Sequence, residues 1–171
     1  MVLLEKTVDI FTVKCDYICQ QTNCIARKNH GFSDSVFKKH GVSPYVKRVG
    51  TPNVAHLTSR PDMGDIEIIP SRTSRNISIV CMHAQYCYGK GKFSHFASKV
   101  NVDDSPLARR AAFQRCLHKL DETIDKKSVV LFPYMIGCNS GGGSWPAYKK
   151  MITEFSNGRY VVICKKPHGT N

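Results

Sequence analysis

The alternation of apolar and polar segments along the chain predicts six short strands. Each strand is an apolar run of three to six residues, and polar or glycine-containing segments separate the runs. Three of the runs are nearly continuous, without alternation, which is typical of strands covered on both faces of a sheet. The predicted strands are residues 2–4, 17–21, 65–69, 77–82, 129–132 and 160–164.

Helical spacing appears in three segments between these strands. Residues 33–40 read as a short helix with Ser33 as its N-cap, and Ser105 followed by Pro106 opens a longer one. Pro146 opens the last helix, which Gly158 would end. Strands alternating with helices predict an α/β protein, a three-layer α/β/α sandwich around a central mixed, mostly parallel sheet.

The chain has 171 residues, and this length fits a single domain spanning 1–171. Two polar segments, 51–64 and 86–104, have no clear element. Loops of that length within one domain are usually functional or mobile. No run of 18 apolar residues exists, so no membrane span is expected.

Eight cysteines occur without any Cys-x-x-Cys pair, and most of them lie in apolar runs. This pattern favours free thiols in a reducing, intracellular setting, cytoplasmic or nuclear, because buried thiols behave as small apolar groups. A zinc site at Cys15, Cys19 and Cys24 with His30 is the alternative, but the spacing matches no zinc-finger pattern. We therefore expect no metal and no cofactor.

The charge is strongly basic. Lys and Arg number 25 against 13 Asp and Glu, a formal net charge of +12. Such a surplus favours polyanionic partners, among them nucleotides and nucleic acid. A nucleic-acid-binding surface would use the basic residues Lys90, Lys92, Lys99, Arg109, Arg110 and Arg115.

A glycine-rich turn between the strand at 129–132 and the last helix is the strongest local signal. A turn in this position exposes backbone amides to an anion, and the helix start adds a positive dipole end. The turn is neither a Walker loop nor a dinucleotide-binding motif. We expect it to bind phosphate through Gly137, Cys138, Asn139, Ser140, Gly141, Gly142 and Gly143.

Polar residues also follow the second strand, as Gln20-Gln21-Thr22-Asn23-Cys24. Open α/β sheets bind ligands at the carboxyl ends of their strands, where a carboxamide can both donate to and accept from a hydroxyl. Further along, Asn29-His30-Gly31-Phe32-Ser33 precedes the short helix, and Gly31 permits close approach of the backbone to a ligand.

Taken in order, these motifs resemble a macrodomain, the ADP-ribose-binding fold. The resemblance runs from about Leu3 to Lys165 and rests on Asp9-Ile10, Gln21-Thr22-Asn23-Cys24, the Gly31 loop, and Pro133-Tyr134-Met135-Ile136-Gly137-Cys138 with Trp145. It is closest to the branch that holds ADP-ribose-1''-phosphate phosphatases and terminal ADP-ribose glycohydrolases, phage and viral members included. The ligand implied is ADP-ribose or a derivative, free or on an ADP-ribosylated protein, bound by a monomer in an infected host cell if the source is viral.

The resemblance also implies residue roles. Asp9 would accept a hydrogen bond from the adenine amino group beside the Ile10 amide, and Asn23 would hold the distal ribose. The glycine-rich turn would cradle the diphosphate. The wall around the distal ribose and its phosphate would consist of His30, Gly31, Phe32, Ser33, Gln85 and Tyr86.

Several departures from the family pattern bear on catalysis. Val8 stands where glycine usually precedes the Asp-Ile pair, and the first ligand loop keeps Gly31 alone. Gln85 or a neighbour occupies the position of the glycohydrolase Lys, Gly141 that of the Asp, and Gln20 replaces the phosphatase-type His. Binding is therefore better supported than turnover. If turnover occurs, the candidate catalytic residues are Asn23, His30 and Asp34, with His83 and Lys90 as further candidate bases.

Overall fold

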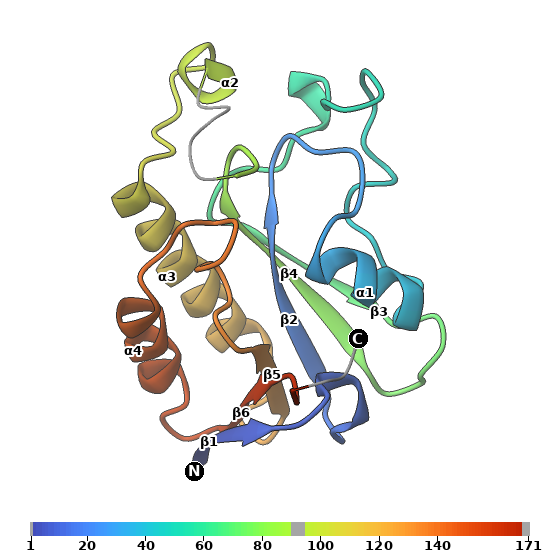
Figure 1. Ribbon diagram of the computed structural model, residues 1–171, viewed down its shortest axis with the longest axis vertical. Helices are drawn as coiled ribbons and strands as arrows, with labels where there is room; N and C mark the ends of the chain where they lie inside the picture. Colours follow the sequence, from blue (N-terminus) through green and yellow to red (C-terminus); the bar gives the residue numbers. More distant parts are fainter. Residues whose placement is uncertain (1, 90–94, 169–171) are drawn as a thin grey trace.

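All six predicted strands form, and they make one sheet in the order β1-β6-β5-β2-β4-β3 (Figure 1). Only β3 runs antiparallel to its neighbour β4; the other four pairings are parallel. The sheet is therefore mixed and mostly parallel, as the apolar runs predicted. The strands are β1 (Val2–Thr7), β2 (Tyr17–Asn23), β3 (Ile66–Pro70), β4 (Ser78–Gln85), β5 (Val129–Pro133) and β6 (Tyr160–Lys165).

Helices cover both faces of this sheet in the computed structural model, which describes residues 2–89 and 95–168. The helices α3 (Pro106–Thr123) and α4 (Trp145–Phe155) bury one face, and α1 (Phe32–His40) with the 3-10 turn η1 (Ile10–Thr12) buries the other. Figure 1 shows α3 and α4 on one side of the strands and α1 on the opposite side. The three-layer sandwich is thus confirmed. No helix of the described ranges is both long and apolar enough to traverse a bilayer.

The helix starts differ in part from the expectation. Ser105 caps α3 as predicted, since its hydroxyl accepts from the Ala108 amide at 3.2 Å. The prediction that Ser33 caps α1 is wrong: Gly31 is the N-cap residue, with φ +55°, and Ser33 lies inside the first turn. The Ser33 hydroxyl instead bonds back to His30, accepting from its amide at 2.9 Å.

At the other end of the chain, α4 begins at Trp145, one residue before Pro146. The expectation that Gly158 ends this helix is also wrong. Ser156 is the C-cap, and Gly158, with φ +75°, lies two residues beyond it in the turn that leads to β6.

The two unassigned segments contain short elements of their own. Segment 51–64 holds the 3-10 turn η2 (Leu57–Ser59) and two isolated bridges, and segment 86–104 holds α2 (His95–Ser98). Lys90 and Lys92 lie outside the described residues.

All eight cysteines are buried and unbridged, as the apolar context of their positions predicted. Burial raises the pKa of most of their thiols, for example of Cys15 and Cys81 to about 12. These side chains are therefore protonated core residues rather than nucleophiles at neutral pH.

Candidate functional site

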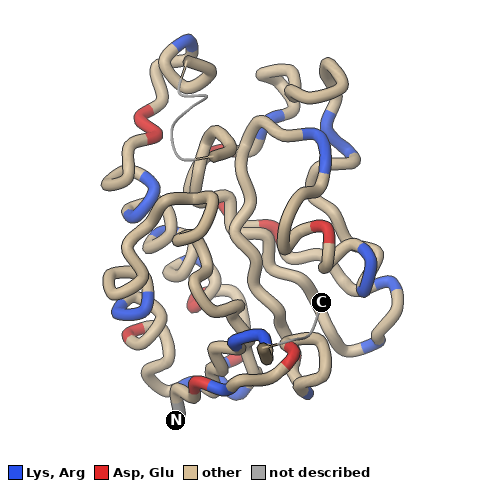
Figure 2. The backbone as a smooth tube through the Cα atoms, in the orientation of Figure 1, with Lys and Arg blue, Asp and Glu red and all other residues tan. Residues whose placement is uncertain are grey.

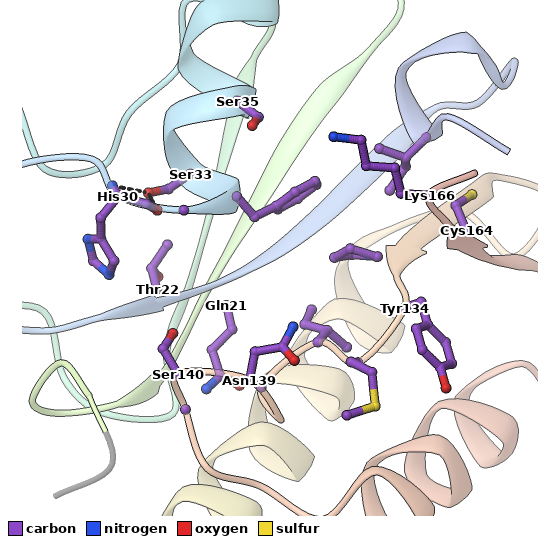
Figure 3. Close-up of a pocket in the computed structure, with 18 of the residues that line it drawn as sticks. Gln21, Thr22, His30, Ser33, Ser35, Tyr134, Asn139, Ser140, Cys164 and Lys166 are labelled. Atoms are coloured by element: carbon purple, nitrogen blue, oxygen red, sulfur yellow. Dashed lines mark hydrogen bonds between the residues drawn. The ribbon is translucent and has the colours of Figure 1, made fainter. Parts of the chain in front are cut away.

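A cavity of about 690 Å³ opens where the parallel strands end (Figure 3). The carboxyl ends of β1, β2, β4, β5 and β6, or the segments that follow them, all contribute to its wall, because the carboxyl ends of parallel strands meet at one edge of a sheet. Its size is that of an ordinary small-molecule site. Twelve residues proposed from the sequence line it: Asp9, Ile10, Asn23, His30, Gly31, Phe32, Ser33, Gln85, Gly137, Asn139, Ser140 and Gly141.

Two of the proposed residues lie away from this wall. Asp34 lies on α1 and pairs with Lys38 one turn later, at 2.8 Å. Tyr86 is buried, and its hydroxyl accepts from the Arg60 guanidinium at 3.0 Å. Neither position gives the side chain a contact with the cavity, so their proposed roles would require a rearrangement.

Three residues of the glycine-rich turn also lie outside the cavity wall. Cys138 is buried against the α3 and α4 side of the core. Gly142 is exposed, and its φ of +73° is a turn conformation that favours glycine. The Gly143 amide donates to the Gly137 carbonyl at 2.9 Å and closes the turn.

The remaining part of the turn, residues 139–141, forms an amide cradle in the cavity wall. No hydrogen bond within the described residues occupies the amides of Asn139, Ser140 and Gly141. A Cβ at Gly141 would lie 2.6 Å from the Gly137 carbonyl oxygen and 3.0 Å from the carboxamide of Gln21. Glycine at 141 is thus required by close packing, and the amides of residues 139–141 remain available for hydrogen bonds at the cavity wall.

The start of α1 supplies a second set of amides. The backbone N–H groups of Phe32 and Ser33 have no partner among the described residues, as expected for the first turn of a helix. Figure 3 shows Ser33 and Ser140 on opposite sides of the cavity, with Thr22 between them. The ring of Phe32 stacks on Phe11, with centroids 5.8 Å apart, and forms an apolar wall beside these amides.

Asn23, at the end of β2, offers its amino group to the cavity. Its side-chain oxygen accepts from the amides of Ile25 at 3.1 Å and Ala26 at 2.8 Å. These two bonds fix the carboxamide so that the amino group is the end without a hydrogen bond in the described chain. A ligand group that meets Asn23 must therefore be an acceptor, such as a ribose oxygen.

Asp9 follows the edge strand β1, whereas His30 follows the inner strand β2, and both line the cavity. One of its carboxylate oxygens accepts from the Phe11 amide at 3.0 Å and caps η1. The side chain is exposed, and no other hydrogen bond of the carboxylate is found in the described residues. Asp9 therefore combines a turn cap with a free acceptor at the cavity rim.

A buried hydrogen-bond chain lies behind the cavity wall. The Thr22 hydroxyl is 2.7 Å from Nδ1 of His83, whose Nε2 is 3.0 Å from Glu67, and Lys47 pairs with the other Glu67 oxygen. Hydrogen bonding to His83 lowers the pKa of Glu67 to about 2, and burial lowers the pKa of His83. At neutral pH the neutral imidazole therefore donates a hydrogen bond from Nε2 to the Glu67 carboxylate and accepts one at Nδ1 from the Thr22 hydroxyl.

This chain predicts a loss of stability in mild acid. The pKa of His83 is depressed below 6.5, so the unfolded chain binds the proton first and stability falls as pH falls below about 6.5. Replacing His83 by Gln should flatten the decline in unfolding free energy between pH 7 and pH 5 and cost about 1–3 kcal/mol at pH 7. Denaturant titrations at several pH values measure both effects.

The control for this experiment is the exposed His118→Gln on α3, which should keep the wild-type slope. Part of the slope should survive in His83→Gln, because burial lowers the pKa of His40 as well. A slope in His83→Gln equal to that of the wild type would contradict the assignment of a neutral His83.

The sequence did not assign several cavity residues to the site. The carboxyl-end rule for parallel strands, applied to β6, would have found Lys165 and Lys166. No sequence signal indicated Tyr45, which a long connection brings under His30 at a ring-centroid distance of 6.0 Å. The additional lining residues are Val8, Phe11, Gln21, Thr22, Ser35, Tyr45, Pro133, Tyr134, Met135, Ile136, Cys164, Lys165 and Lys166.

Comparison with known proteins identifies the fold. No protein-family model and no curated protein sequence matches the chain. Among solved structures, the macrodomain of Mycobacterium tuberculosis DarG superposes with a TM-score of 0.63 at 12% identity, over 97% of this chain and 98% of that one. The chain has the macrodomain fold.

Two other solved structures also superpose on this chain. Thermosipho africanus DarTG, solved in complex with ADP-ribose, matches with a TM-score of 0.61 at 12% identity, over 95% of this chain and 41% of that one. A Bacteroides thetaiotaomicron protein of unknown function matches with a TM-score of 0.65 at 18% identity, over 96% of this chain and 98% of that one. At these identities the macrodomain likeness is one of fold, so function has to be argued from the cavity.

Proposed function

We propose that this macrodomain-fold protein binds ADP-ribose or an ADP-ribose derivative in the cavity at the strand ends. The observation that carries the proposal is the pair of facing amide sets, at the start of α1 and in residues 139–141, both without partners in the described chain. Backbone amides at a helix start and in a glycine-rich turn suit a diphosphate. The ADP-ribose complex of the structurally similar DarTG supports the same choice of ligand.

The flanking residues orient the nucleotide in this proposal. Asp9, with a free carboxylate oxygen at the rim, accepts from the adenine amino group, while Asn23 donates to the distal ribose. The diphosphate lies between Ser33 and Ser140, which Figure 3 places on opposite sides of the cavity. The aromatic wall of Phe11 and Phe32 supplies apolar contact along one side.

Calorimetric titration with ADP-ribose, with ADP as the comparison ligand, tests this proposal. Both should bind, and ADP-ribose should bind more tightly because it alone reaches Asn23. If neither ADP-ribose nor ADP binds at millimolar concentration, the proposal is overturned.

Replacing Asp9 by Ala should weaken ADP-ribose binding by about 1–3 kcal/mol, the effect of losing a hydrogen bond to a charged group. The same change removes the cap of η1, so some stability is lost as well. Titration of the folded variant separates the two effects, and Asp9→Ser restores a capping hydroxyl as the control. A Ser variant with wild-type affinity would show that capping is the only role of Asp9.

We further propose that the bound derivative is hydrolysed, with ADP-ribose-1''-phosphate and ADP-ribosyl conjugates on protein as the two candidate substrates. The Thr22–His83–Glu67 chain supports this choice, because it connects a hydroxyl at the cavity wall to an ionised carboxylate. Of the candidate catalytic residues, Asn23 and His30 line the cavity and Asp34 does not. Incubation with each substrate distinguishes hydrolysis from binding alone, the alternative in which the protein only recognises ADP-ribose.

Nucleic-acid binding receives less support as a separate function. Lys and Arg are spread around the molecule rather than gathered on one face of a helix in the view of Figure 2. Arg109, one of the proposed contacts to a nucleic-acid backbone, is 3% exposed, and its guanidinium donates to Asp104 and to the Gly89 carbonyl. A buried guanidinium cannot neutralise a phosphate, so that part of the expectation is wrong.

A further inference from the structure

Two consecutive lysines border the cavity at its Asp9 end. Lys165 is the last residue of β6, and Lys166 follows it. The Val8 amide donates to the Lys165 carbonyl at 2.9 Å, so the backbone of this pair is fixed directly beside the Val8–Asp9 segment. Figure 3 shows Lys166 at the opposite end of the cavity from His30 and Ser140.

Neither ammonium group forms an ion pair within the described residues. The Lys165 ammonium instead lies 5.0 Å from the centre of the Tyr134 ring, a cation–π contact that leaves its hydrogen-bonding capacity unused. Five other lysines do pair with acids: Lys38, Lys47, Lys119, Lys126 and Lys149. Lys165 and Lys166 thus have no ion-pair partner among the described residues, and with Asp9 at the same end the wall there keeps an excess positive charge.

ADP-ribose does not use this charge in the proposed pose. Its diphosphate lies between α1 and the glycine-rich turn, and its adenine lies beside Asp9, the one acidic residue among the described residues of the cavity wall. The lysines then face the nucleoside end, where ADP-ribose itself carries no anion. Lysine binds phosphate as a point charge, so a second anionic group at this end would be attracted.

We propose that Lys165 and Lys166 recognise a phosphate-bearing substituent on the adenosine ribose of the ligand. The inference rests on the proposed function, because it takes the adenine to lie beside Asp9. Two sources carry this chemistry: a simple 2'-phosphate, as in ADP-ribose derived from a phosphorylated dinucleotide, and the next unit of an ADP-ribose polymer. In both, the added phosphate lies within the positive field of the two ammonium groups.

Calorimetric titrations with ADP-ribose, 2'-phospho-ADP-ribose and a purified ADP-ribose dimer test the inference. At low salt, at least one of the two extended ligands should bind about tenfold more tightly than ADP-ribose. That preference should shrink as salt is added, since the lysines lie at the rim of the cavity. The ligand with the larger preference identifies the source of the second phosphate.

The variant that tests the residues is the double change Lys165→Ala, Lys166→Ala. It should reduce the preference to about twofold or less while changing ADP-ribose affinity by less than about threefold. The matched control is Lys38→Ala, Lys39→Ala, which removes two adjacent lysines from the exposed end of α1, outside the cavity wall. The control should keep the preference, because the same net charge is lost without any change at the site.

The outcomes separate this inference from the proposed function. Equal affinity for all three ligands would overturn the lysine assignment and leave ADP-ribose binding intact. Retention of the preference in the Lys165, Lys166 double variant, or its loss in the control, would also overturn it. Absence of binding by all three ligands would overturn the proposed function itself.

Discussion

Replacing Ser140 by Glu is expected to weaken ADP-ribose binding at least about a hundredfold. Ser140 borders the cavity in the segment whose amides are free, so a carboxylate there would lie next to the ligand diphosphate. Two unit charges about 4 Å apart near a protein surface repel by roughly 4 kcal/mol, which is more than enough for this loss. The measurement is a calorimetric titration of the variant, with the ligand-induced rise in melting temperature as a second readout.

Ser144→Glu is the matched control for this experiment. It adds the same charge four residues later, at the N-cap of α4, where the side chain is exposed and away from the cavity. A carboxylate there should be neutral to mildly stabilising, because it faces the positive end of the helix dipole. Wild-type ADP-ribose affinity in Ser140→Glu, or an equal loss in the control, would show that the turn does not hold the diphosphate.

Serine at 140 is a better probe than the neighbouring Gly142. With φ +73° and an exposed position, Gly142 would resist any side chain for reasons of backbone strain. A Glu at 142 would therefore test turn geometry more than ligand binding. The sequence could not separate Gly141 from Gly142, because the reason for each glycine, close packing in one case and positive φ in the other, depends on the folded turn.

The fold was predictable because its central strands are buried on both faces. Val80, Cys81 and Met82 of β4 are all fully buried, and such continuous apolar runs leave few alternatives to a sheet covered by helices on each side. Helix ends were less predictable. Ser33 is a residue type that is common at N-caps, but Gly31, with its positive φ, is the N-cap residue two positions earlier.

The candidate site was predictable only as far as strand ends and glycine turns mark it. Gln85 contributes to the cavity as expected, while its neighbour Tyr86 turns into the core and bonds to Arg60. Side chains alternate between the two faces of a strand, so only one of these two neighbours can point into the cavity. The pairing of β2 with β4 has a register irregularity at this end, and the sequence alone therefore does not show which of the two it is. No sequence motif around Lys165 distinguished it from an ordinary solvent-exposed lysine at the end of a strand.

Arg109 shows most clearly how a surface assignment can be wrong. Its position on α3, beside Arg110, reads as part of a solvated basic face. In the structure the side chain is 3% exposed and forms a bidentate pair with Asp104, both contacts at 2.8 Å. It also donates to the carbonyl of Gly141 at 3.0 Å, so it ties the glycine-rich turn to the helix behind it.

The Asp104 carboxylate, the partner of Arg109, makes further hydrogen bonds to the segment after β4. Its two oxygens accept from the amides of Tyr86 and Cys87, at 2.8 and 2.9 Å, just after β4 ends. Arg109 reaches the same segment through the Cys87 carbonyl at 3.2 Å and the Gly89 carbonyl at 2.7 Å. One buried ion pair thus holds together the segment after β4 and the amide cradle of residues 139–141.

Replacing Arg109 by Ala should consequently be the most destabilising of the changes considered, by about 3–5 kcal/mol. Removing one partner of a buried pair leaves the other charge uncompensated, here a carboxylate that is itself 3% exposed. Denaturant unfolding measures the loss, and Arg115→Ala, an exposed position six residues along α3, is the control expected to cost less than about 1 kcal/mol.

If Arg109→Ala does not fold, Arg109→Lys keeps the charge but not the fork that reaches Gly141, and it should weaken ADP-ribose binding more than it lowers stability. A Lys variant with unchanged affinity, or an Ala variant as stable as the wild type, would show that the ion pair does not hold the cradle in place.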